Sequence, residues 1–324
     1  MPFIEHSSYH PPFYFRNGHI STIYSGRIKK TAIPGYKREK LELPDGDFLL
    51  IDSIELNQAK KALILCHGLE GDSRRSYNNT CANYFLEKGF SVFAWNNRSC
   101  GGEMNRLPRF YHHGTVEDLD SIVQHVLDKG FEEIYLVGFS LGAAQILNYF
   151  GQFEVDKRIK AGVAVSAPIQ LKSSAEKLKR GFNRIYLNVF TKKLKKKFIE
   201  KARQHPDLID LKRIPEIKTF DEVDEYFTAP LHGFRNKDEY YEKAAPAYSI
   251  EKIKTPVLVI NALDDPFLSE GCYPVEFSKN HKFVYLEIPK YGGHCAFPLS
   301  GSRYSWVDFR SYEFFNSEIT SKGF

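Results

Sequence analysis

Residues 132–149 read EEIYLVGFSLGAAQILNY, and the rest of the chain is arranged around this stretch. Its centre, residues 138–142, has the form GxSxG with Ser140 in the middle. The residues before the centre form an apolar, β-branched and aromatic run of strand length, and the apolar residues after it recur at helical spacing. A serine on a sharp turn between a strand and a helix is typical of a nucleophile elbow. We therefore predict that Ser140 is a catalytic nucleophile.

The chemistry of such an elbow explains the glycines on either side of Ser140. The turn crowds the backbone, so a Cβ at Gly138 or Gly142 would collide with it. The helix after the serine directs its free N–H groups and its positive dipole end towards developing negative charge. The alternative is that Gly138 and Gly142 are loop glycines beside a buried serine, but the strand and helix patterns favour the catalytic interpretation.

The composition fits a globular protein that needs neither metals nor disulfides for stability. The 324 residues are 42% hydrophobic and 15% aromatic, enough for one large core or two ordinary ones. The five cysteines are odd in number and contain no CxxC pair, so we expect no disulfide framework, no metal site and no cofactor. No stretch approaches the length of a membrane span, and the first residues do not resemble a signal peptide. We therefore predict a cytoplasmic protein.

Strand-like and helix-like patterns alternate along most of the chain. This alternation predicts an α/β fold with a mostly parallel sheet flanked by helices. A Pro-Asp-Gly turn at residues 44–46 predicts a β-hairpin between residues 41–43 and 48–54. The other predicted strands are residues 62–66, 90–95, 134–137, 161–165, 256–260 and 283–288, and the clearest predicted helices are residues 77–87, 116–127 and 306–319.

The alternation is interrupted once, between Pro168 and Lys254, where the pattern is helical only. We predict a core made of residues 1–168 and 251–324, with residues 1–40 as a surface arm rich in proline and tyrosine. Residues 169–250 are predicted to form a helical cap inserted above the strand ends. Active sites of open α/β sheets lie at these ends, so the cap would shape the substrate pocket.

An activated serine needs a base that takes its proton and an acid that holds the tautomer of the base. After an elbow serine, the acid and then the histidine are expected further along the chain. The loop after strand 256–260 carries Asp264 and Asp265, and the Gly-rich loop after strand 283–288 carries His294. Both loops leave the sheet at the end where the elbow lies. We predict His294 as the base; the alternative is a surface-loop histidine.

The oxyanion hole is predicted to consist of two backbone N–H groups. One belongs to Leu141, directly after the nucleophile, and the other to Leu69 in the turn after strand 62–66. Gly68 and Gly71 allow that turn to approach the substrate closely, whereas His67 is predicted to be structural.

The loop after strand 90–95 is expected at the rim of the pocket, with Arg98 among its residues. Two cysteines, Cys100 and Cys295, are expected to line the site. No base is placed in the sequence to activate a thiolate, so we treat both cysteines as bystanders.

Several motifs together resemble the YheT-like branch of the α/β-hydrolase superfamily. The resemblance implies an α/β-hydrolase fold and a Ser-Asp-His hydrolase acting on esters, including lipid-like acyl esters. One departure is Ser99, at a position where the family often has glycine. The motifs are PPFYFRNGHISTI (11–23), HGLEG (67–71), NNRSCGGEMNRLPRFYHHG (96–114), GFSLGA (138–143), FDEVDEYFTAPLHGFRNKDEYY (220–241), NALDDPF (261–267) and GGHCAF (292–297).

Ser140, Asp265 and His294 are the positions that match the family triad. In many α/β-hydrolases the acid precedes a proline, three residues past a small residue that ends the strand. Ala262 fits the small residue and Asp265 fits the acid, with Asp264 as a capping or hydrogen-bonding neighbour. Asp264 remains the alternative for the acid.

The predicted cap contains a strongly basic segment. Residues 171–204 carry twelve Lys or Arg against two Glu, whereas the whole chain has a net charge of only +5. Aromatic and aliphatic residues recur every fourth position from Phe182 to Phe198, which predicts an amphipathic helix. In one interpretation, the apolar stripe packs on the core or lines the acyl pocket, and the lysines lie on a solvated face. In the other, the cap contacts an anionic membrane surface. No nucleic-acid motif accompanies the charge, so nucleic acid is not expected as a partner. The clustered lysines are Lys192, Lys193, Lys195, Lys196 and Lys197.

The predicted function is hydrolysis of a small-molecule carboxylic ester through an acyl-enzyme on Ser140. Acyl transfer to an alcohol or thiol is an alternative, because it shares the acyl-enzyme half of the reaction. A non-catalytic α/β-hydrolase scaffold is the second alternative, since a fold does not by itself imply an activity. If the protein meets a membrane, we expect it at the inner surface, bound peripherally through the cap.

Overall fold

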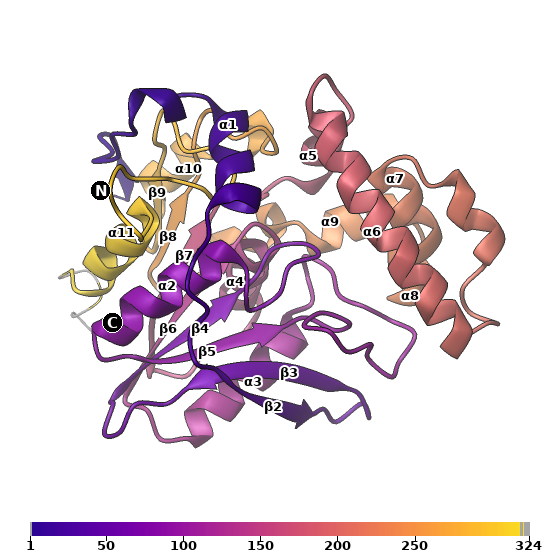
Figure 1. Ribbon diagram of the computed structural model, residues 1–324, viewed down its shortest axis with the longest axis horizontal. Helices are drawn as coiled ribbons and strands as arrows, with labels where there is room; N and C mark the ends of the chain where they lie inside the picture. Colours follow the sequence, from indigo (N-terminus) through magenta and orange to yellow (C-terminus); the bar gives the residue numbers. More distant parts are fainter. Residues whose placement is uncertain (1, 318–319, 321–324) are drawn as a thin grey trace.

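A nine-stranded sheet forms the centre of the computed structural model, which describes residues 2–317 and 320 (Figure 1). The strand order is β1-β9-β8-β7-β6-β4-β5-β3-β2. Neighbours from β1 to β5 in this order run parallel, whereas β3 is antiparallel to β5 and β2 to β3. The predicted mostly parallel sheet is therefore confirmed. The strands are β1 Phe3–Ile4, β2 Lys37–Glu42, β3 Phe48–Ile54, β4 Lys61–Cys66, β5 Ser91–Asn96, β6 Glu133–Phe139, β7 Ile159–Val165, β8 Val257–Ile260 and β9 Val284–Glu287.

The central strands are buried on both faces, as their continuous apolar sequences require. Each residue from Ala62 to Cys66 in β4 has no exposed surface. Parallel pairing of β4 with β6 places Cys66 opposite Gly138, directly before the elbow. The carboxyl end of β4 and the elbow therefore lie side by side.

Helices cover both faces of the sheet (Figure 1). Ile122 of α3 and Leu147 of α4 belong to the hydrophobic cluster on one face, and Phe85 of α2 and Phe314 of α11 belong to the cluster on the other. The predicted helices at 77–87 and 116–127 are confirmed, and the third ends at Phe315; its predicted end at residue 319 lies outside the described residues. The helices are α2 Ser76–Glu87, α3 Val116–Asp128, α4 Leu141–Gln152, α10 Val275–Asn280 and α11 Trp306–Phe315, with the 3-10 turn η7 Glu270–Cys272.

Between β7 and β8 the described chain contains helices and no strand, in the region where the sequence predicts a cap. Figure 1 shows these helices gathered at the right of the view, beside the sheet. The longest, α6, has 22 residues. None of the described helices combines the length and the apolar composition needed to span a membrane. The elements are α5 Leu171–Leu178, α6 Asn183–Gln204, η3 Leu211–Glu216, α7 Phe220–Val223, the π-helix η4 Asp224–Thr228, α8 Ala229–Leu231, α9 Lys237–Ala244, η5 Pro246–Tyr248 and η6 Ile250–Lys252.

The N-terminal residues do more than form a surface arm. β1 pairs with β9, with Phe3 opposite Leu286, and β2 begins at Lys37, four residues before the predicted hairpin. Three short helical elements lie between these strands: η1 Phe13–Phe15, α1 Gly18–Ile23 and the π-helix η2 Tyr24–Ile28. Isolated helices this short are unstable in water, so contacts with the rest of the chain must hold them. For this reason the local sequence pattern did not reveal them.

Candidate active site

Ser140 lies on a strained turn between β6 and α4. Its φ of 55° and ψ of −114° are unusual for a residue with a side chain. A Cβ added to Gly138 would lie 2.4 Å from the carbonyl oxygen of Gly142, and one added to Gly142 would lie 2.3 Å from that of Cys66. Both glycines are therefore needed for the close packing of the turn, as the sequence predicts.

The structure brings Ser140, His294 and Asp265 into one hydrogen-bonded chain. His294 Nε2 lies 2.9 Å from Ser140 Oγ. On the other side of the ring, His294 Nδ1 lies 2.9 Å from Asp265 Oδ2 and 3.1 Å from Oδ1. The Asp265 side chain is fully buried, and that of His294 is 10% exposed. This geometry allows the histidine to take a proton from the serine while the carboxylate holds the ring.

The two neighbouring carboxylates occupy different places. Asp264 Oδ1 accepts a hydrogen bond from the backbone N–H of Gly293, 2.9 Å away. Among the described residues Asp264 makes no hydrogen bond to the His294 ring, whereas Asp265 faces it. Asp264 thus braces the loop that carries the histidine.

The buried carboxylate of Asp265 controls the charge of His294. Burial disfavours the imidazolium, but the negative charge of Asp265 outweighs burial and raises the pKa of His294. Phe267 stacks on the imidazole, with ring centroids 4.1 Å apart, and shields it from water. The histidine is therefore fixed in position and most basic while Asp265 is ionised.

The N-terminal helix α1 supports the histidine loop, which the sequence analysis missed. The backbone N–H of His294 donates to Thr22 Oγ1 over 2.8 Å, and Thr22 Oγ1 in turn donates to the carbonyl of Gly18. A Cβ at Gly18 would lie 1.8 Å from the carbonyl oxygen of Asp264, so only glycine permits this contact. Asn17 caps α1 by accepting from two backbone N–H groups. An Asn-Gly pair before a short helical pattern was the available signal.

The two predicted oxyanion donors, Leu69 and Leu141, both line the cavity beside Ser140. Within the described part of the chain, neither backbone N–H makes a hydrogen bond. His67, predicted to be structural, is buried, and its Nε2 accepts from the backbone N–H of Asn97. Burial lowers the pKa of His67 to about 4, so this imidazole stays neutral near neutral pH.

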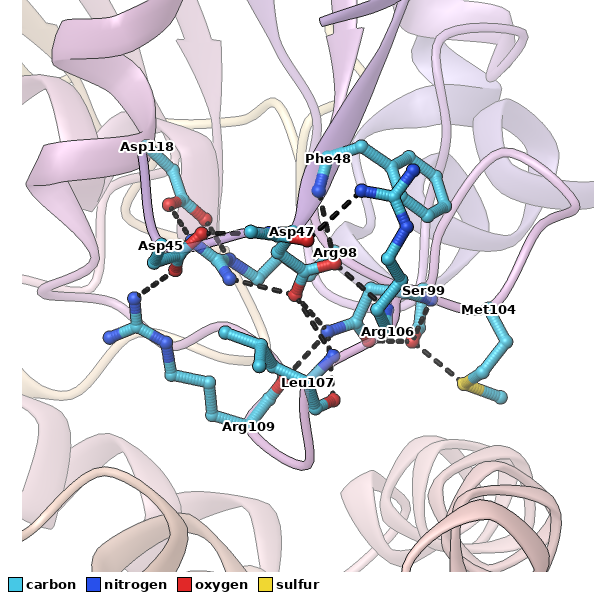
Figure 2. A network of polar contacts seen from close by, with 12 residues as sticks. Asp45, Asp47, Phe48, Arg98, Ser99, Met104, Arg106, Leu107, Arg109 and Asp118 are labelled. Carbon is cyan, nitrogen blue, oxygen red and sulfur yellow. Dashed lines mark hydrogen bonds and ion pairs between the residues drawn. The ribbon is translucent and has the colours of Figure 1, made fainter. Parts of the chain in front are cut away.

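Arg98 was expected at the pocket rim but is instead buried in an ionic cluster away from the cavity. Figure 2 shows its guanidinium among three carboxylates, from Asp45, Asp47 and Asp118, at 2.7 to 2.8 Å. A buried arginine requires such partners because unpaired charge is costly to desolvate. Ser99, where the family often has glycine, has a φ of 59°, which explains why glycine is favoured there.

An open cavity of about 1080 Å³, including its mouth, separates Ser140 from the cap. Side chains of α5, α6, α7 and η4 form its cap-side wall, and most of them are apolar. Phe198 of α6 stacks on Phe227 of η4 with ring centroids 4.1 Å apart. The prediction that part of the apolar stripe lines a pocket is therefore confirmed. Its members on the cavity wall are Phe190, Leu194 and Phe198.

The lysines of α6 do not all lie on a solvated face. Lys197 Nζ pairs with Glu70 Oε1 over 2.6 Å, and Lys193 Nζ reaches the backbone carbonyl of Glu70. Lys201 is fully buried against the carbonyls of Asn105 and Leu107. These three lysines follow each other at four-residue spacing and attach the cap helix to the core. The expectation of solvated lysines is wrong for Lys193 and Lys197.

The structure offers no evident metal site in its described part. Among residues 2–317 and 320, no group of three or more His, Cys, Asp or Glu is arranged to hold a metal ion. All five cysteines are free thiols and buried. Burial raises the pKa of Cys100, which keeps this thiol protonated near neutral pH.

Comparisons with known proteins agree with the fold and with the ester chemistry. A family model described as alpha/beta hydrolase fold matches residues 61–300. The putative esterase YheT of Escherichia coli is 28% identical over 289 residues, which cover 87% of this chain and 85% of the relative. Phospholipase ABHD3 of Mus musculus is 28% identical over 300 residues, covering 90% of this chain and 73% of the relative. The resemblance to the YheT-like branch is confirmed.

The solved structure of esterase Pf2001 from Pyrococcus furiosus superposes on the chain with a TM-score of 0.57. It covers 96% of this chain and 98% of the other, at 19% identity. At this level of identity the similarity shows the fold alone.

Proposed function

The chain belongs to the α/β-hydrolase fold family and is a carboxylic-ester hydrolase, and from this premise we propose that Ser140, His294 and Asp265 form its catalytic triad. The observation that carries the proposal is the hydrogen-bonded chain from Ser140 Oγ through His294 to Asp265 beside an apolar cavity. A strained elbow and a fully buried acid support it further.

In the first half of the reaction, Ser140 Oγ attacks the acyl carbonyl while His294 Nε2 takes the hydroxyl proton. The carbonyl electron pair moves to oxygen, and the N–H groups of Leu69 and Leu141 stabilise this oxyanion. The bond to the alcohol then breaks, the alcohol leaves with the proton from Nε2, and an acyl-enzyme remains on Ser140.

In the second half, water takes the place of the alcohol. His294 Nε2 removes a proton from the water as its oxygen attacks the acyl carbon. The tetrahedral intermediate collapses, Ser140 Oγ leaves and recovers its proton from His294, and the carboxylic acid is released. Asp265 remains ionised throughout and stabilises the imidazolium each time it forms.

The apolar cavity suggests a substrate with a long acyl chain. Each methylene transferred from water to such a wall contributes about 0.8 kcal/mol, so a wall of Phe190, Leu194 and Phe198 favours alkyl chains over acetyl groups. The relative named as a phospholipase supports a lipid-like ester. We expect p-nitrophenyl octanoate to be hydrolysed with a higher kcat/KM than the acetate.

The first experiment is labelling of the wild type and Ser140→Ala with a fluorophosphonate probe, followed by ester hydrolysis. We expect labelling and turnover of the wild type only, with the variant losing at least about 10⁴-fold in kcat. Equal labelling of both proteins would mean that another residue is the nucleophile. A folded wild type with neither labelling nor turnover would favour the non-catalytic scaffold.

Hydrolysis and acyl transfer differ only in what attacks the acyl-enzyme. Product analysis with and without glycerol as an added acceptor separates them. We expect free acid as the main product in both cases, and a dominant glyceryl ester would establish the transferase alternative.

We also propose a peripheral contact between the cap and anionic membrane. Ile185, Lys192, Lys196 and Ile199 fall at the i, i+7, i+11 and i+14 positions of one face of α6, and all four are exposed. Ile185 is 52% exposed and Ile199 is 41% exposed. A face that combines exposed apolar groups with cations suits a surface of acidic lipids.

Flotation with phosphatidylcholine vesicles, with and without phosphatidylserine, tests this contact. We expect binding only with phosphatidylserine, weakening as salt rises, and lost in the double variant Lys192→Glu/Lys196→Glu. The matched control is Lys252→Glu/Lys254→Glu, which changes two exposed lysines that lie outside α6 and beyond the predicted cap of residues 169–250. Absence of binding at low salt would remove the proposal.

A further inference from the structure

We propose that Glu70 is a positioning residue that links the oxyanion loop to the cap helix α6, so that an acyl chain under the cap orders the Leu69 N–H. The inference rests on the proposed function, because it concerns how the same cavity and the same oxyanion hole communicate. It gives a function to the segment of α6 with Lys193 and Lys197. Among the described residues, this is the only part of the cap whose charged side chains bind the loop after β4.

Glu70 immediately follows the proposed oxyanion donor, and its backbone N–H, its carbonyl oxygen and Oε1 each have a partner. Its backbone N–H donates to the Tyr111 hydroxyl, and that hydroxyl donates to Glu70 Oε1, both over 2.8 Å. Its carbonyl accepts from Arg75 and Lys193. The φ of Glu70 is 53°, a left-handed conformation that non-glycine residues rarely adopt. These contacts are what hold the loop in that conformation.

The link to the cap is a nearly buried ion pair. Lys197 Nζ lies 2.6 Å from Glu70 Oε1, with side-chain exposures of 14% and 5%. Lys197 Nζ also approaches Cys100 Sγ at 3.4 Å, on the loop after β5. Charges this far from water interact more strongly than surface pairs, and removing one partner leaves the other uncompensated. The position of α6 therefore affects the conformation at Glu70 directly.

The same helix face touches the cavity. Leu194 and Phe198, the residues next to Lys193 and Lys197 in sequence, line the wall that would contact an acyl chain. A chain seated against Leu194 and Phe198 presses on the helix segment that carries both lysines. Because Glu70 is bonded to those lysines, the adjacent Leu69 N–H responds to whether the cavity is filled. The chain would thus improve stabilisation of the oxyanion as well as binding.

Thiono esters, in which sulfur replaces the carbonyl oxygen, provide a direct readout of the oxyanion hole. Sulfur is larger and a weaker hydrogen-bond acceptor than oxygen, so a well-formed hole strongly favours the oxygen ester. We would measure the ratio of kcat/KM for the oxygen and thiono esters of p-nitrophenol, with acetyl and octanoyl chains. In the wild type we expect the ratio to be about tenfold higher for octanoyl than for acetyl, a fraction of the 10²–10³ that one donor supplies.

The variants are Lys197→Met, Glu70→Gln and the conservative Lys197→Arg, with Arg203→Met as the matched control. In Lys197→Met and Glu70→Gln we expect the ratio to lose its dependence on chain length, with a fall in kcat larger than the change in KM. Lys197→Arg retains the charge and should restore most of the dependence. Arg203 is exposed on the same helix and does not line the cavity, so its replacement should leave the ratio at the wild-type value.

The outcomes separate the inference from the proposed function. A chain-length dependence that survives in Lys197→Met or Glu70→Gln, or that is absent in the wild type, overturns the inference while leaving Ser140 labelling intact. Loss of Ser140 labelling in the wild type would overturn the proposed function itself. If Lys197→Met does not fold, the other two variants test the inference. Glu70→Gln keeps an acceptor for the Tyr111 hydroxyl, and Lys197→Arg keeps the positive charge.

Discussion

The two halves of the cavity are built in different ways. On the core side, loops at the ends of parallel strands present Ser140, His294 and the Leu69 N–H. Ser140 has a positive φ, as do Cys295 and Glu70, which directly follow His294 and Leu69. On the cap side, the wall consists mainly of apolar side chains on helices. In the mechanism proposed above, the core half carries out the reaction and the cap half selects the acyl group. The comparison predicts that substitutions on the core side change the rate, whereas substitutions on the cap side change the substrate preference.

The core half depends on exact backbone contacts. Ser166, at the end of β7, has a φ of 54°, and its hydroxyl accepts from the backbone N–H of Cys295, which has a φ of 56°. In the cap half, by contrast, apolar contacts such as the stacking of Phe198 on Phe227 shape the cavity wall. Apolar packing tolerates change of shape better than a hydrogen-bonded catalytic array does.

Among the variants that test this comparison between the two halves, the largest effect is expected for Asp265→Asn. Asparagine leaves the shape of the site but no longer holds the ring in the tautomer that has a free Nε2, so kcat should fall by about 10³- to 10⁴-fold. The preference between octanoyl and acetyl esters should stay at the wild-type value, and steady-state kinetics with both esters checks this. A changed chain preference would contradict the separation of the two halves.

The same variant makes a prediction about pH. The reaction needs neutral His294, and Asp265 raises the pKa of His294, so activity is lost as the pH falls through that pKa. Removing the negative charge lowers the pKa, and the acidic limb of the kcat/KM profile should move to lower pH. Asp264→Asn is the control, because it keeps Asp265. It should change kcat by less than about tenfold and leave the acidic limb of the kcat/KM profile at the wild-type pH.

A smaller effect is expected for Phe190→Ala, and it should change the substrate preference rather than the rate on every ester. Phe190 lines the cavity, so its loss should lower kcat/KM for the octanoyl ester about tenfold, equivalent to the burial of roughly two methylenes, and leave the acetyl ester nearly unchanged. Phe182→Ala, at a residue that is 49% exposed, is the matched control. Equal losses on both esters would show that the cap wall also affects the chemistry.

The smallest effect concerns the stability of the cap wall. Burial raises the pKa of Asp224 to about 7, although the Thr228 and Tyr241 hydroxyls that bind it act in the opposite direction. The folded protein therefore holds a proton that the unfolded chain loses near pH 4, so stability contributed by this group declines as pH rises from about 4 to 7. Asp224→Asn should flatten that part of the profile in thermal melts. An unchanged slope would mean that Asp224 ionises in the folded protein as in the unfolded chain.

The contrast also explains what could be predicted from the sequence. The elbow, the parallel strands and the loops with Asp265 and His294 follow from local patterns, because each depends on a few neighbouring residues. The structure places these three side chains together; their catalytic roles remain to be tested by the variants above.

The remainder depends on contacts between distant segments. Nothing local to Lys197 shows that its partner is Glu70, 127 positions away, and a run of lysines on a helix usually indicates a solvated face. Arg98 likewise follows a strand that ends near the pocket, yet its partners lie on the hairpin and on α3. The support that α1 gives to the histidine loop was invisible for the same reason.

The contact between helix α1 and the loop that carries His294 affects when activity can appear during synthesis of the protein. The N–H of His294 and the hydroxyl of Thr22 are 272 positions apart, and Ser140 lies 154 positions before its histidine. Of these three segments, a ribosome therefore makes the helix that carries Thr22 first, Ser140 next and His294 last. A nascent chain carries Ser140 without its partner until 154 further positions have been translated, and we expect ester cleavage to begin only when the segments of Thr22 and His294 have met. Enzyme activity is thus a direct report of completed folding.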